Sequence, residues 1–592
     1  MYRTHHLNQL NEGDDKKEVV LSGWVHRRRD HGGVIFIDLR DRYGLTQIVS
    51  DPVNHKEAHD LMDKARSEFV LRIEGTVRPR PGDNKNPNMV TGAIEVLVHK
   101  AEILSSSKTP PFEIDQDKEV GEDLRLTYRY LDLRRERMKN NIVLRHQVIK
   151  HVRDYMDANQ FIEVETPILI KGTPEGSREY LVPSRIYPGT FYVLPQSPQQ
   201  LKQLLMIGGF DRYFQIARCF RDEDQRGDRQ PEFSQLDIEM SFTDQEEIID
   251  LNEKLLIELT EKFCPDKKIM SKPFPRLTYD EAMNRYGSDS PDIRYELELT
   301  DVSEIVESCE FGIFSDAVKN GGVVKALRVE GAAKFTRKEI DDLTEVAKIY
   351  GAKGMAYIVY KDGELKSPIV KFFKEQELKA ISEKTRAKEG DIVFFTADQF
   401  HTACESLGAV RKELAKLLNL IDDSIFAYLW VTDFPMFEHD KESGSLNAVH
   451  HPFTAPHDSK ELEDAPEKAL AKAYDVVLNG TEVGGGSIRI HEEAVQKKVF
   501  DILKITNEDA EQRFGHMLEA FKYGAPPHGG IAWGLDRLVM IFAGEPNIRE
   551  VIAFPKDQKA KDLMLGAPSP MPDEQIEELG IKVKKEQKKE TE

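Results

Sequence analysis

The sequence predicts an α+β protein built from several domains. Its 592 residues are enough for about four domains of ordinary size. Residues 1–108 hold five segments of strand composition and one helical segment, Lys56–Arg66, after the third. That order fits a small OB-fold β-barrel, whose open face binds single-stranded nucleic acid. Residues 213–242 add two strand segments joined by a long charged loop, which predicts an antiparallel hairpin.

The composition is that of a globular chain without a membrane segment. Hydrophobic residues make up 40% and charged residues 32% of the sequence. No apolar run approaches the roughly 20 residues needed to span a bilayer, and the N-terminus lacks an apolar signal core. We therefore expect a cytoplasmic protein with no membrane partner. The cysteines lie far apart, which argues against a disulfide framework and a thiolate zinc site: Cys219, Cys264, Cys309 and Cys404.

The net charge of −21 argues mildly against nucleic-acid binding, because phosphate contacts need Lys and Arg. Two basic clusters point the other way, at His26–Arg29 and Arg134–Arg137. An acidic protein can bind RNA through local basic faces while its remaining charge limits non-specific binding. The second cluster lies in a predicted amphipathic helix after a stiff break at Thr109–Pro111. That helix either lies along an RNA or presents an ordinary solvated face.

The predicted hairpin carries a cation on one strand and a ring with acids on the other. Tyr213–Phe220 runs straight into Arg221, and the second strand is Phe233–Phe242. Alternation places four side chains of the second strand on one face: Phe233, Gln235, Asp237 and Glu239. Such a surface can hold a purine, a phosphate and an ammonium group. Taken alone, the stretch is more often an ordinary charged hairpin, so the rest of the chain has to decide.

Three stretches, taken in their order along the chain, favour a functional hairpin over an ordinary charged one. They are FIEVETPIL at 161–169, RDEDQRGDRQPEFSQLDIE at 221–239 and GGIAWGLDRLVM at 529–540. These resemble motifs 1, 2 and 3 of the class II aminoacyl-tRNA synthetases. The details are most similar to the bacterial-type aspartyl-tRNA synthetases of class IIb, and the resemblance covers nearly the whole chain.

The resemblance implies an antiparallel-sheet catalytic domain, an N-terminal OB-fold β-barrel and an α+β insertion domain. It implies this division: 1–108 anticodon-binding OB fold, 109–140 hinge or linker, 141–290 first part of the catalytic domain, 291–420 bacterial (GAD-like) insertion, 421–555 second part of the catalytic domain, and 556–592 C-terminal extension. The insertion shows no chemistry in its sequence, and the last dozen residues have a disordered composition. Because motif 1 packs at a dimer interface in this family, we expect a homodimer.

The implied reaction has two steps and uses ATP and Mg²⁺. L-aspartate and ATP form aspartyl-adenylate, and the aspartyl group then passes to the 3′ end of tRNA(Asp). Arg221 and Arg537 are the expected catalytic cations on the phosphates. The nucleotide is expected to contact Arg221, Asp222, Glu223, Gln230, Phe233, Glu482, Gly534, Leu535, Asp536 and Arg537.

Two carboxylates near position 480 favour a metal site. Asp475 and Glu482 fall on neighbouring predicted strands, an arrangement that suits a Mg²⁺ that keeps waters and phosphate oxygens. The glycines at 484–486 let a backbone approach a ligand closely. A histidine-based metal site is not expected, because His450 and His451 have no third ligand at suitable spacing.

The resemblance also implies which residues bind aspartate: Glu175, Gln199, Lys202, Arg221, Asp237, His450 and Arg489. Lys202 and Arg489 are expected to grip the side-chain carboxylate, and Asp237 with Gln199 the ammonium group. His450 and His451 are adjacent on a segment predicted to be extended, so only one of them should line the site. We choose His450 by resemblance. Its alternative role is that of a structural histidine.

The anticodon residues implied for the barrel are Arg29, Phe36, Gln47 and Glu95. From the pattern alone, Phe36 is as well explained as a core residue. His31 and Gly82 resemble the relaxed, non-discriminating form that also charges tRNA(Asn). Alternative functions are an asparaginyl or lysyl synthetase, an amino-acid ligase that makes no aminoacyl-tRNA, and a non-catalytic RNA-binding paralogue. The long insertion and the run GTEVGGGSIR favour aspartate.

Overall fold

The computed structural model describes residues 1–592 except 83, 117, 173–176, 440–443 and 585–592. The chain divides into two compact units. One comprises Met1–Arg145 and Arg549–Pro570, and the other comprises His146–Ile548 and Met571–Glu592. The expected last dozen disordered residues fall largely outside the described residues. No helix in the described part of the chain is both long and apolar enough to cross a membrane.

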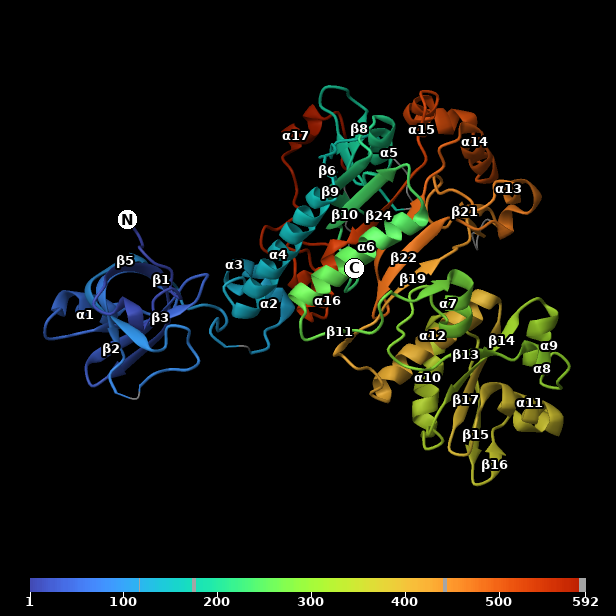
Figure 1. Cartoon of the computed structure of the whole chain (residues 1–592), viewed down its shortest axis with the longest axis horizontal. Coiled ribbons are helices and arrows are strands. Elements are labelled where there is room, and N and C mark those ends of the chain that lie inside the picture. Colours follow the sequence, from blue (N-terminus) through green and yellow to red (C-terminus); the bar gives the residue numbers. More distant parts are fainter. Residues whose placement is uncertain (83, 117, 173–176, 440–443, 585–592) are drawn as a thin grey trace, which may run out of the picture. The chain divides into compact units, whose positions relative to one another are not determined.

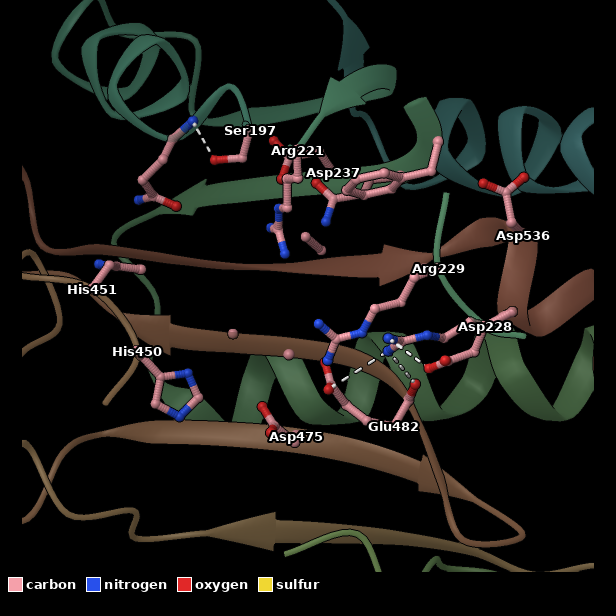
Figure 2. Close-up of a pocket in the computed structure, with 18 of the residues that line it drawn as sticks. Ser197, Arg221, Asp228, Arg229, Asp237, His450, His451, Asp475, Glu482 and Asp536 are labelled. Atoms are coloured by element: carbon pink, nitrogen blue, oxygen red, sulfur yellow. Dashed lines mark hydrogen bonds and ion pairs between the residues drawn. The ribbon is translucent and has the colours of Figure 1, made fainter. Parts of the chain in front are cut away.

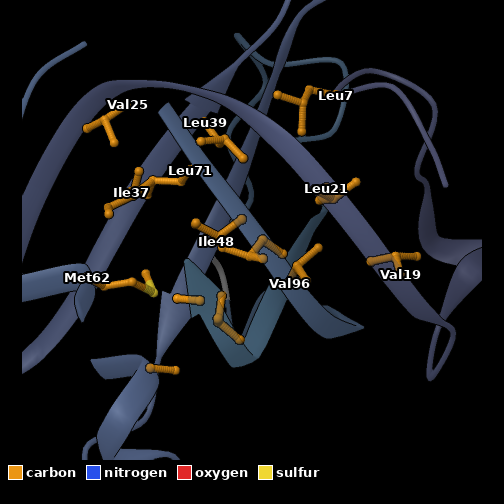
Figure 3. Close-up of a cluster of buried hydrophobic side chains, with 14 of the residues drawn as sticks. Leu7, Val19, Leu21, Val25, Ile37, Leu39, Ile48, Met62, Leu71 and Val96 are labelled. Carbon is orange, nitrogen blue, oxygen red and sulfur yellow. The ribbon is translucent and has the colours of Figure 1, made fainter. Parts of the chain in front are cut away.

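The first unit contains the predicted OB-fold barrel. Its strands close in the order β1-β2-β3-β5-β4, with helix α1 following the third strand as predicted. The bounds are β1 Glu18–His31, β2 Val34–Arg40, β3 Leu45–Ser50, α1 Lys56–Lys64, β4 Val70–Pro79 and β5 Ile94–Ser105. Alternate side chains of β1 and β4 turn inward. They fill the apolar core seen in Figure 3, which includes Val19, Leu21, Ile37, Ile48 and Leu71.

The segment after the barrel differs from the predicted single basic helix. It forms α2 (Glu122–Thr127), α3 (Arg129–Asp132) and the start of α4 (Glu136–Ala158). Its arginines are engaged with acids: Arg134 lies 2.8 Å from Glu68, and Arg135 lies 3.5 Å from Asp132. The expectation of a solvated or RNA-facing cluster is therefore wrong for Arg135, which is buried, whereas Arg134 is partly exposed.

An eight-stranded sheet forms the centre of the second unit, in the order β12-β19-β22-β23-β24-β10-β9-β6 (Figure 1). Pairing is antiparallel except at the two edges, where β6–β9 and β12–β19 are parallel. The bounds are β6 Ile162–Glu163, β9 Arg212–Phe220, β10 Glu232–Ser241, β12 Arg276–Thr278, β19 Tyr428–Thr432, β22 Ala473–Leu478, β23 Thr481–Ile488 and β24 His528–Gly534. Helices α5 (Gln199–Ile207), α6 (Gln245–Phe263) and α16 (Leu535–Ala543) pack against it.

The insertion forms its own α+β layer structure in the same unit. Its sheet has the order β13-β14-β17-β15-β16. One face packs on α10 and α12, and the other on α8, α9 and α11. The bounds are β13 Leu299–Asp301, α8 Ser303–Val306, α9 Gly312–Lys319, β14 Val323–Val329, α10 Arg337–Ile349, β15 Ala356–Lys361, β16 Glu364–Lys366, α11 Glu375–Thr385, β17 Ile392–Asp398 and α12 Phe400–Leu417.

Short elements connect these parts. They are η1 Glu12–Asp14, β7 Leu181–Pro183, β8 Phe191–Val193, β11 Lys268–Ile269, α7 Tyr279–Tyr286, η2 Val370–Phe372, β18 Ile425–Phe426, β20 Phe437–His439, β21 Leu446–Ala448, α13 Glu461–Asp464, η3 Pro466–Lys468, α14 Glu493–Ile502, α15 Asn507–Phe521, η4 Ile548–Glu550 and α17 Asp573–Glu578.

Candidate active site

One cavity in the second unit gathers most of the predicted site residues. It has a volume of about 490 Å³ and is lined by residues of α5, β10, β22, β23, β24 and α16 (Figure 2). The predicted residues that line it are Gln199, Lys202, Arg221, Glu223, Gln230, Phe233, Asp237, His450, Asp475, Glu482, Arg489, Gly534, Asp536 and Arg537. Arg221, Arg489 and Arg537 therefore share one cavity.

Three predicted contacts are not among the lining residues. Asp222 is exposed outside the cavity, where its main-chain N–H donates to Arg178. Leu535 is fully buried in the core beneath the cavity wall. That these two residues contact the nucleotide stays a prediction. Glu175 lies outside the described residues.

The hairpin of β9 and β10 places a cation beside a ring, as its sequence predicted. The strands pair antiparallel from Arg212↔Met240 to Phe220↔Glu232. Arg221 follows the end of β9, and its Cζ lies 5.3 Å from the centroid of the Phe233 ring. The geometry leaves a planar aromatic surface and a guanidinium group facing the same space.

An ion pair within the loop, between Arg229 and Glu223, restrains the loop of this hairpin. Arg229 donates Nη1 to Glu223 at 2.8 Å, and the Ser177 hydroxyl also donates to Glu223. Burial acts to raise the pKa of Glu223, but the Ser177 hydrogen bond and the Arg221 and Arg229 charges bring that pKa below its usual value. Glu223 is therefore an ionised acceptor at neutral pH.

Two cations and two carboxylates form a buried cluster at one end of the cavity. Lys202 Nζ lies 2.8 Å from Asp237 Oδ1 and 3.2 Å from Glu239 Oε2. Arg489 donates Nε and Nη2 to the two oxygens of Glu239 at 2.9 and 3.1 Å. All four side chains belong to residues that are at most 2% exposed. Glu239 thus neutralises both cations and fixes their positions.

The two carboxylates of this cluster titrate differently. Burial raises the pKa of Asp237, although Lys202 opposes that effect. Burial also acts on Glu239, but the charges of Arg489 and Lys202 more than offset it and lower its pKa to about 2. Glu239 therefore stays ionised, and Asp237 is the acid whose charge depends most on what else enters the cavity.

Both His450 and His451 line the cavity, so the prediction that only one could do so is wrong. They lie in a bend after β21, where side chains do not alternate as they would in an extended strand. His451 Nε2 lies 2.7 Å from Arg489 Nη1, and His450 packs edge-on against Phe434 with ring centroids 4.8 Å apart. Burial and the Arg489 charge lower the pKa of His450 to about 4 and that of His451 well below its usual value. Both rings are neutral at pH 7.

The hairpin of β22 and β23 carries the two predicted metal ligands. Asp475 lies opposite Gly485, and a Cβ added at Gly485 would lie 2.6 Å from Asp475 Oδ1. That oxygen is buried and has no hydrogen-bond partner among the described residues. Burial, Glu482 and Asp289 raise the pKa of Asp475 well above its usual value. A buried, unpartnered carboxylate beside a second carboxylate fits a divalent cation.

The glycines at 484–486 serve packing as well as access. A Cβ at Gly486 would lie 2.2 Å from the main-chain oxygen of Gly530, and one at Gly484 would lie 2.7 Å from the Trp533 ring. These two glycines allow β23 and β24 to approach. Of the three, Gly485 and Gly486 line the cavity.

Arg537 projects from the first turn of α16, as predicted from the order strand, glycine, helix. Its Nη1 donates to the main-chain oxygen of Glu482 at 3.1 Å, and its Nη2 lies 3.2 Å from Asp228 Oδ2. Asp536 accepts from the main-chain N–H of Ser234 at 2.8 Å, which ties α16 to β10. Figure 2 shows Asp228, which pairs with Arg537, well apart from His451, which pairs with Arg489.

Comparison with known proteins agrees with this geometry. The family model "tRNA synthetases class II (D, K and N)" matches residues 121–558, and an "OB-fold nucleic acid binding domain" model matches residues 19–104. Aspartate–tRNA(Asp/Asn) ligase of Natranaerobius thermophilus is 53% identical over 587 residues, covering 99% of this chain and all of that protein. The chain belongs to the aspartate–tRNA ligase family of class II tRNA synthetases.

Other relatives agree with this assignment. Aspartate–tRNA ligase of Geobacillus kaustophilus is 53% identical, covering 98% of this chain and 99% of that protein. Among solved structures, asparaginyl-tRNA synthetase of Pyrococcus horikoshii has a TM-score of 0.59 at 19% identity, covering 94% of this chain and 98% of that one. Aspartyl-tRNA synthetase of Entamoeba histolytica has a TM-score of 0.57 at 20% identity, covering 93% and 91%. At such identity the structures show a shared fold.

The predicted anticodon residues of this synthetase lie together on the barrel. Arg29 pairs with Phe36 across β1 and β2, and its guanidinium donates to Asp38 at 2.8 Å through both Nη atoms. Gln47 accepts from Arg29 at 3.3 Å and donates to Glu95 at 2.9 Å. Gln47 and Glu95 are buried, whereas Arg29 and Phe36 are partly exposed. Phe36 is therefore not simply a core residue.

The two predicted discrimination residues belong to the same unit: His31 is the last residue of β1, and Gly82 lies in a turn after β4. The His31 ring contacts the Phe36 ring edge-on, with centroids 5.9 Å apart. Gly82 has a φ of +61° and no atom within 4 Å of a Cβ placed on it. A side chain at position 82 would meet backbone strain but open space.

Four residues that shape the site have no role in the sequence-based prediction: His451 and Asp289 line the cavity, and Glu239 and Ser487 contact Arg489. His451 was excluded by an incorrect assumption of extended backbone, and Glu239 was placed on the correct face but given no role. The Ser487 hydroxyl accepts from Arg489 Nη1 at 2.6 Å, and its position two residues before Arg489, near the end of β23, could have suggested this contact. Asp289 had no local signal, because it reaches the cavity from a loop far from the three motifs.

Proposed function

We propose that this protein activates L-aspartate with ATP as aspartyl-adenylate and transfers the aspartyl group to tRNA(Asp), and also to tRNA(Asn). The observation that carries the proposal is that four cations line one cavity: Lys202, Arg221, Arg489 and Arg537. An acidic amino acid and a nucleotide need cations at separate places if their reacting groups are to meet in line.

At the aspartate end, Arg489 and Lys202 bind the side-chain carboxylate. Both are held by Glu239, so their positions are fixed before the substrate arrives. The substrate ammonium group lies near Asp237 and Gln199, and its charge favours the ionised form of Asp237 against burial. Asparagine is rejected because its neutral amide leaves the two cations without a matching charge.

His450 and His451 support this end as neutral groups. His451 accepts a hydrogen bond from Arg489 Nη1, which restrains the guanidinium plane. A charged imidazole here would add a third cation beside Arg489 and Lys202. Burial keeps the pKa of both rings low, so they orient the arginine without repelling it.

At the nucleotide end, Phe233 stacks on the adenine and Arg221 binds the α-phosphate. Glu223 and Gln230 hold the rest of the nucleoside, and Arg537 binds the γ-phosphate. Aspartate's α-carboxylate attacks the α-phosphorus, and Arg221 stabilises the charge that develops on the phosphate oxygens as pyrophosphate leaves. No protein nucleophile takes part.

Asp475 and Glu482 hold Mg²⁺ in this proposal. Their fit is supported by the unpartnered oxygen of Asp475 and by Gly485, which leaves room beside it. A bound Mg²⁺ neutralises phosphate charge and orders the phosphate oxygens. The pairing of β22 with β23 holds the two carboxylates next to each other.

The tRNA is recognised by the barrel through Arg29, Phe36, Gln47 and Glu95, with Phe36 stacking on an unpaired base. His31 and Gly82 underlie the use of both tRNAs. A homodimer forms through the motif 1 segment, supported by the exposed apolar side chains Ile162, Ile168 and Leu169. The division of the chain into the six segments given by the sequence analysis is also part of this proposal.

The test begins with ATP–pyrophosphate exchange in the presence of one amino acid at a time. Exchange with aspartate, and none with asparagine or lysine, is expected. Charging of total tRNA follows, with the charged species identified. Exchange with another amino acid as the best substrate would overturn the proposal, and a product limited to tRNA(Asp) would remove only the use of tRNA(Asn).

A further inference from the structure

Asp289 brings a third carboxylate to the phosphate end of the cavity from outside the three motifs. It lies in the loop between α7 and β13, just before the insertion, and lines the same cavity as Asp475 and Glu482. It is exposed at the cavity rim, and the Ser290 hydroxyl donates to its Oδ1 at 3.2 Å.

This loop packs against the hairpin that carries the two metal ligands. A Cβ added at Gly480, in the turn between β22 and β23, would lie 2.9 Å from Asp292 Cβ. Arg294 donates Nη2 to Asp292 Oδ2 at 2.8 Å, which fixes the loop at that point. Asp289 is therefore anchored beside Asp475 and Glu482 through its own segment.

Helix α12 of the insertion holds the loop from the other side. Arg411, which is 3% exposed, donates to the main-chain oxygens of Asp292, Tyr295 and Leu297 at 2.8, 3.1 and 2.6 Å. Its Cζ lies 4.2 Å from the centroid of the Tyr295 ring and 4.9 Å from that of Tyr286. A buried arginine with this many partners is costly to move.

Two glycines bring the helices into backbone contact at the start of the loop. Gly287 ends α7 with a φ of +66°, and a Cβ there would lie 2.2 Å from the main-chain oxygen of Cys404. A Cβ on Gly408 would lie 2.2 Å from the main-chain oxygen of Gly287. A Cβ at either position would clash with the facing main chain, so α12 and the start of the Asp289 loop are in close backbone contact.

We propose that Asp289 is a positioning residue that strengthens divalent-cation binding at Asp475 and Glu482, and that the insertion holds it there through Arg411. Within the described residues, no group of three His, Cys, Asp or Glu side chains is placed to hold a metal ion, so Asp289 does not complete a three-carboxylate ligand set with Asp475 and Glu482. Outer carboxylates orient the ligands and waters of a metal, and their loss lowers metal affinity by about 10–100-fold. The insertion thereby contributes to cation binding at the active site. This inference rests on the proposed function.

The decisive measurement is Mn²⁺ binding by electron paramagnetic resonance in the presence of the β,γ-methylene analogue of ATP. Asp289→Asn should weaken Mn²⁺ binding about tenfold, and should raise the Mg²⁺ needed for half-maximal exchange by a similar factor. The KM for aspartate should not change. Glu296→Gln is the matched control, because Glu296 is exposed on the same segment but lies outside the cavity. Wild-type Mn²⁺ affinity in Asp289→Asn would overturn the inference.

A double-mutant cycle tests the role of the insertion. Arg411→Lys should weaken Mn²⁺ binding, and Asp289→Asn combined with Arg411→Lys should be no weaker than Asp289→Asn alone. Additive losses, or normal Mn²⁺ binding in a folded Arg411→Lys protein, would remove Arg411 from the proposal. If Arg411→Lys fails to fold, Tyr295→Leu takes its place in the same cycle. Failure of the wild type to activate aspartate would instead count against the proposed function.

Discussion

Arg489 is bound on three sides before any substrate enters. Its contacts to Glu239, His451 and Ser487 use all three of its nitrogen atoms. Such an arginine cannot swing to find its ligand, so the ligand must fit the arginine. In the proposed function, the buried charge cluster selects an acidic substrate because its geometry is set in advance and a neutral side chain leaves its charge unmatched.

Replacing Arg489 by Leu should abolish aspartate activation far more than ATP binding. The change removes a substrate cation and leaves Glu239 with only Lys202, and breaking a buried ion pair costs about 3–5 kcal/mol. We expect kcat/KM for aspartate in pyrophosphate exchange to fall about 10³-fold, with the KM for ATP nearly unchanged.

Arg218→Leu provides the matched control for this prediction. Arg218 is a partly exposed arginine on β9 that pairs with Glu232 outside the buried cluster. Its loss should leave exchange almost unaffected. Near-normal exchange by Arg489→Leu at ordinary aspartate concentrations would refute the role given to Arg489.

The buried neutral histidines make stability depend on pH. His450 has a pKa of about 4 in the fold against an ordinary value of 6.5, so the unfolded chain binds a proton first as the pH falls. Its contribution is therefore intact above pH 6.5 and is lost between about pH 6.5 and 4. From pH 7 to 5.5 the loss is about 1 kcal/mol for this one residue.

His450→Gln should flatten this pH dependence. Calorimetric unfolding at pH 7 and 5.5 should show a smaller drop in melting temperature for the variant than for the wild type. Glu239 does not interfere, because its pKa of about 2 places its titration below this range. Equal drops in the two proteins would show that His450 is protonated in the fold.

At the scale of elements, the pairing of β22 with β23 brings together the two carboxylates of the proposed metal site. The register that sets Asp475 opposite Gly485 also keeps Glu482 on the adjoining strand. Since strand side chains alternate, a change in register would send one carboxylate to the other face of the sheet. The glycines that permit close packing with β24 thus also determine where the two acids meet.

Gly485→Ala should disturb this site without unfolding the sheet. The added methyl group would lie 2.6 Å from Asp475 Oδ1, so the carboxylate has to move. We expect the Mg²⁺ concentration for half-maximal exchange to rise severalfold and the melting temperature to fall only slightly. Gly354→Ala is the control, because no atom lies within 4 Å of a Cβ there. An unchanged Mg²⁺ requirement would show that Asp475 is not a ligand.

Elements with a strong local pattern could be predicted from the sequence. The hairpin at 212–241 follows from alternation and a polar loop, and the helix that presents Arg537 follows from a glycine after an apolar strand. The break between α2 and α4 could not be predicted, because its cause is distant. Arg129 is 2% exposed and donates to main-chain oxygens of Arg549, Ile552 and Ala553, more than 400 residues away. Tertiary contacts there override a helical pattern.

The same contrast applies to the site. Asp475, Glu482 and Arg489 lie in one stretch of paired strands, so their grouping has a local cause. Asp289 reaches them only because Asp292 packs at Gly480 and Arg411 holds the loop. His451 faces the cavity because the chain bends after β21, and the residue pattern alone does not predict that bend. Residues placed by long-range packing are the ones that sequence periodicity cannot find.

At the scale of the whole molecule, the two compact units carry different parts of the proposed reaction. The cavity residues belong to His146–Ile548, and the candidate base-reading residues belong to Met1–Arg145. Activation of aspartate needs no tRNA in this proposal, whereas transfer needs both units. Substitutions in the barrel should therefore affect charging and leave exchange unchanged.

Phe36→Ala separates the two activities most directly. Phe36 is a partly exposed ring flanked by His31, and stacking of one base on such a ring contributes about 1–3 kcal/mol. We expect kcat/KM for tRNA(Asp) to fall about 10- to 100-fold, while pyrophosphate exchange with aspartate stays within about twofold of the wild type. Tyr2→Ala removes an aromatic side chain that is more exposed, in the same unit and outside the predicted base-reading set, and should alter neither activity. Because the barrel core does not include Phe36, a parallel loss of exchange cannot be ascribed to a weakened barrel and would mean that the units do not act separately.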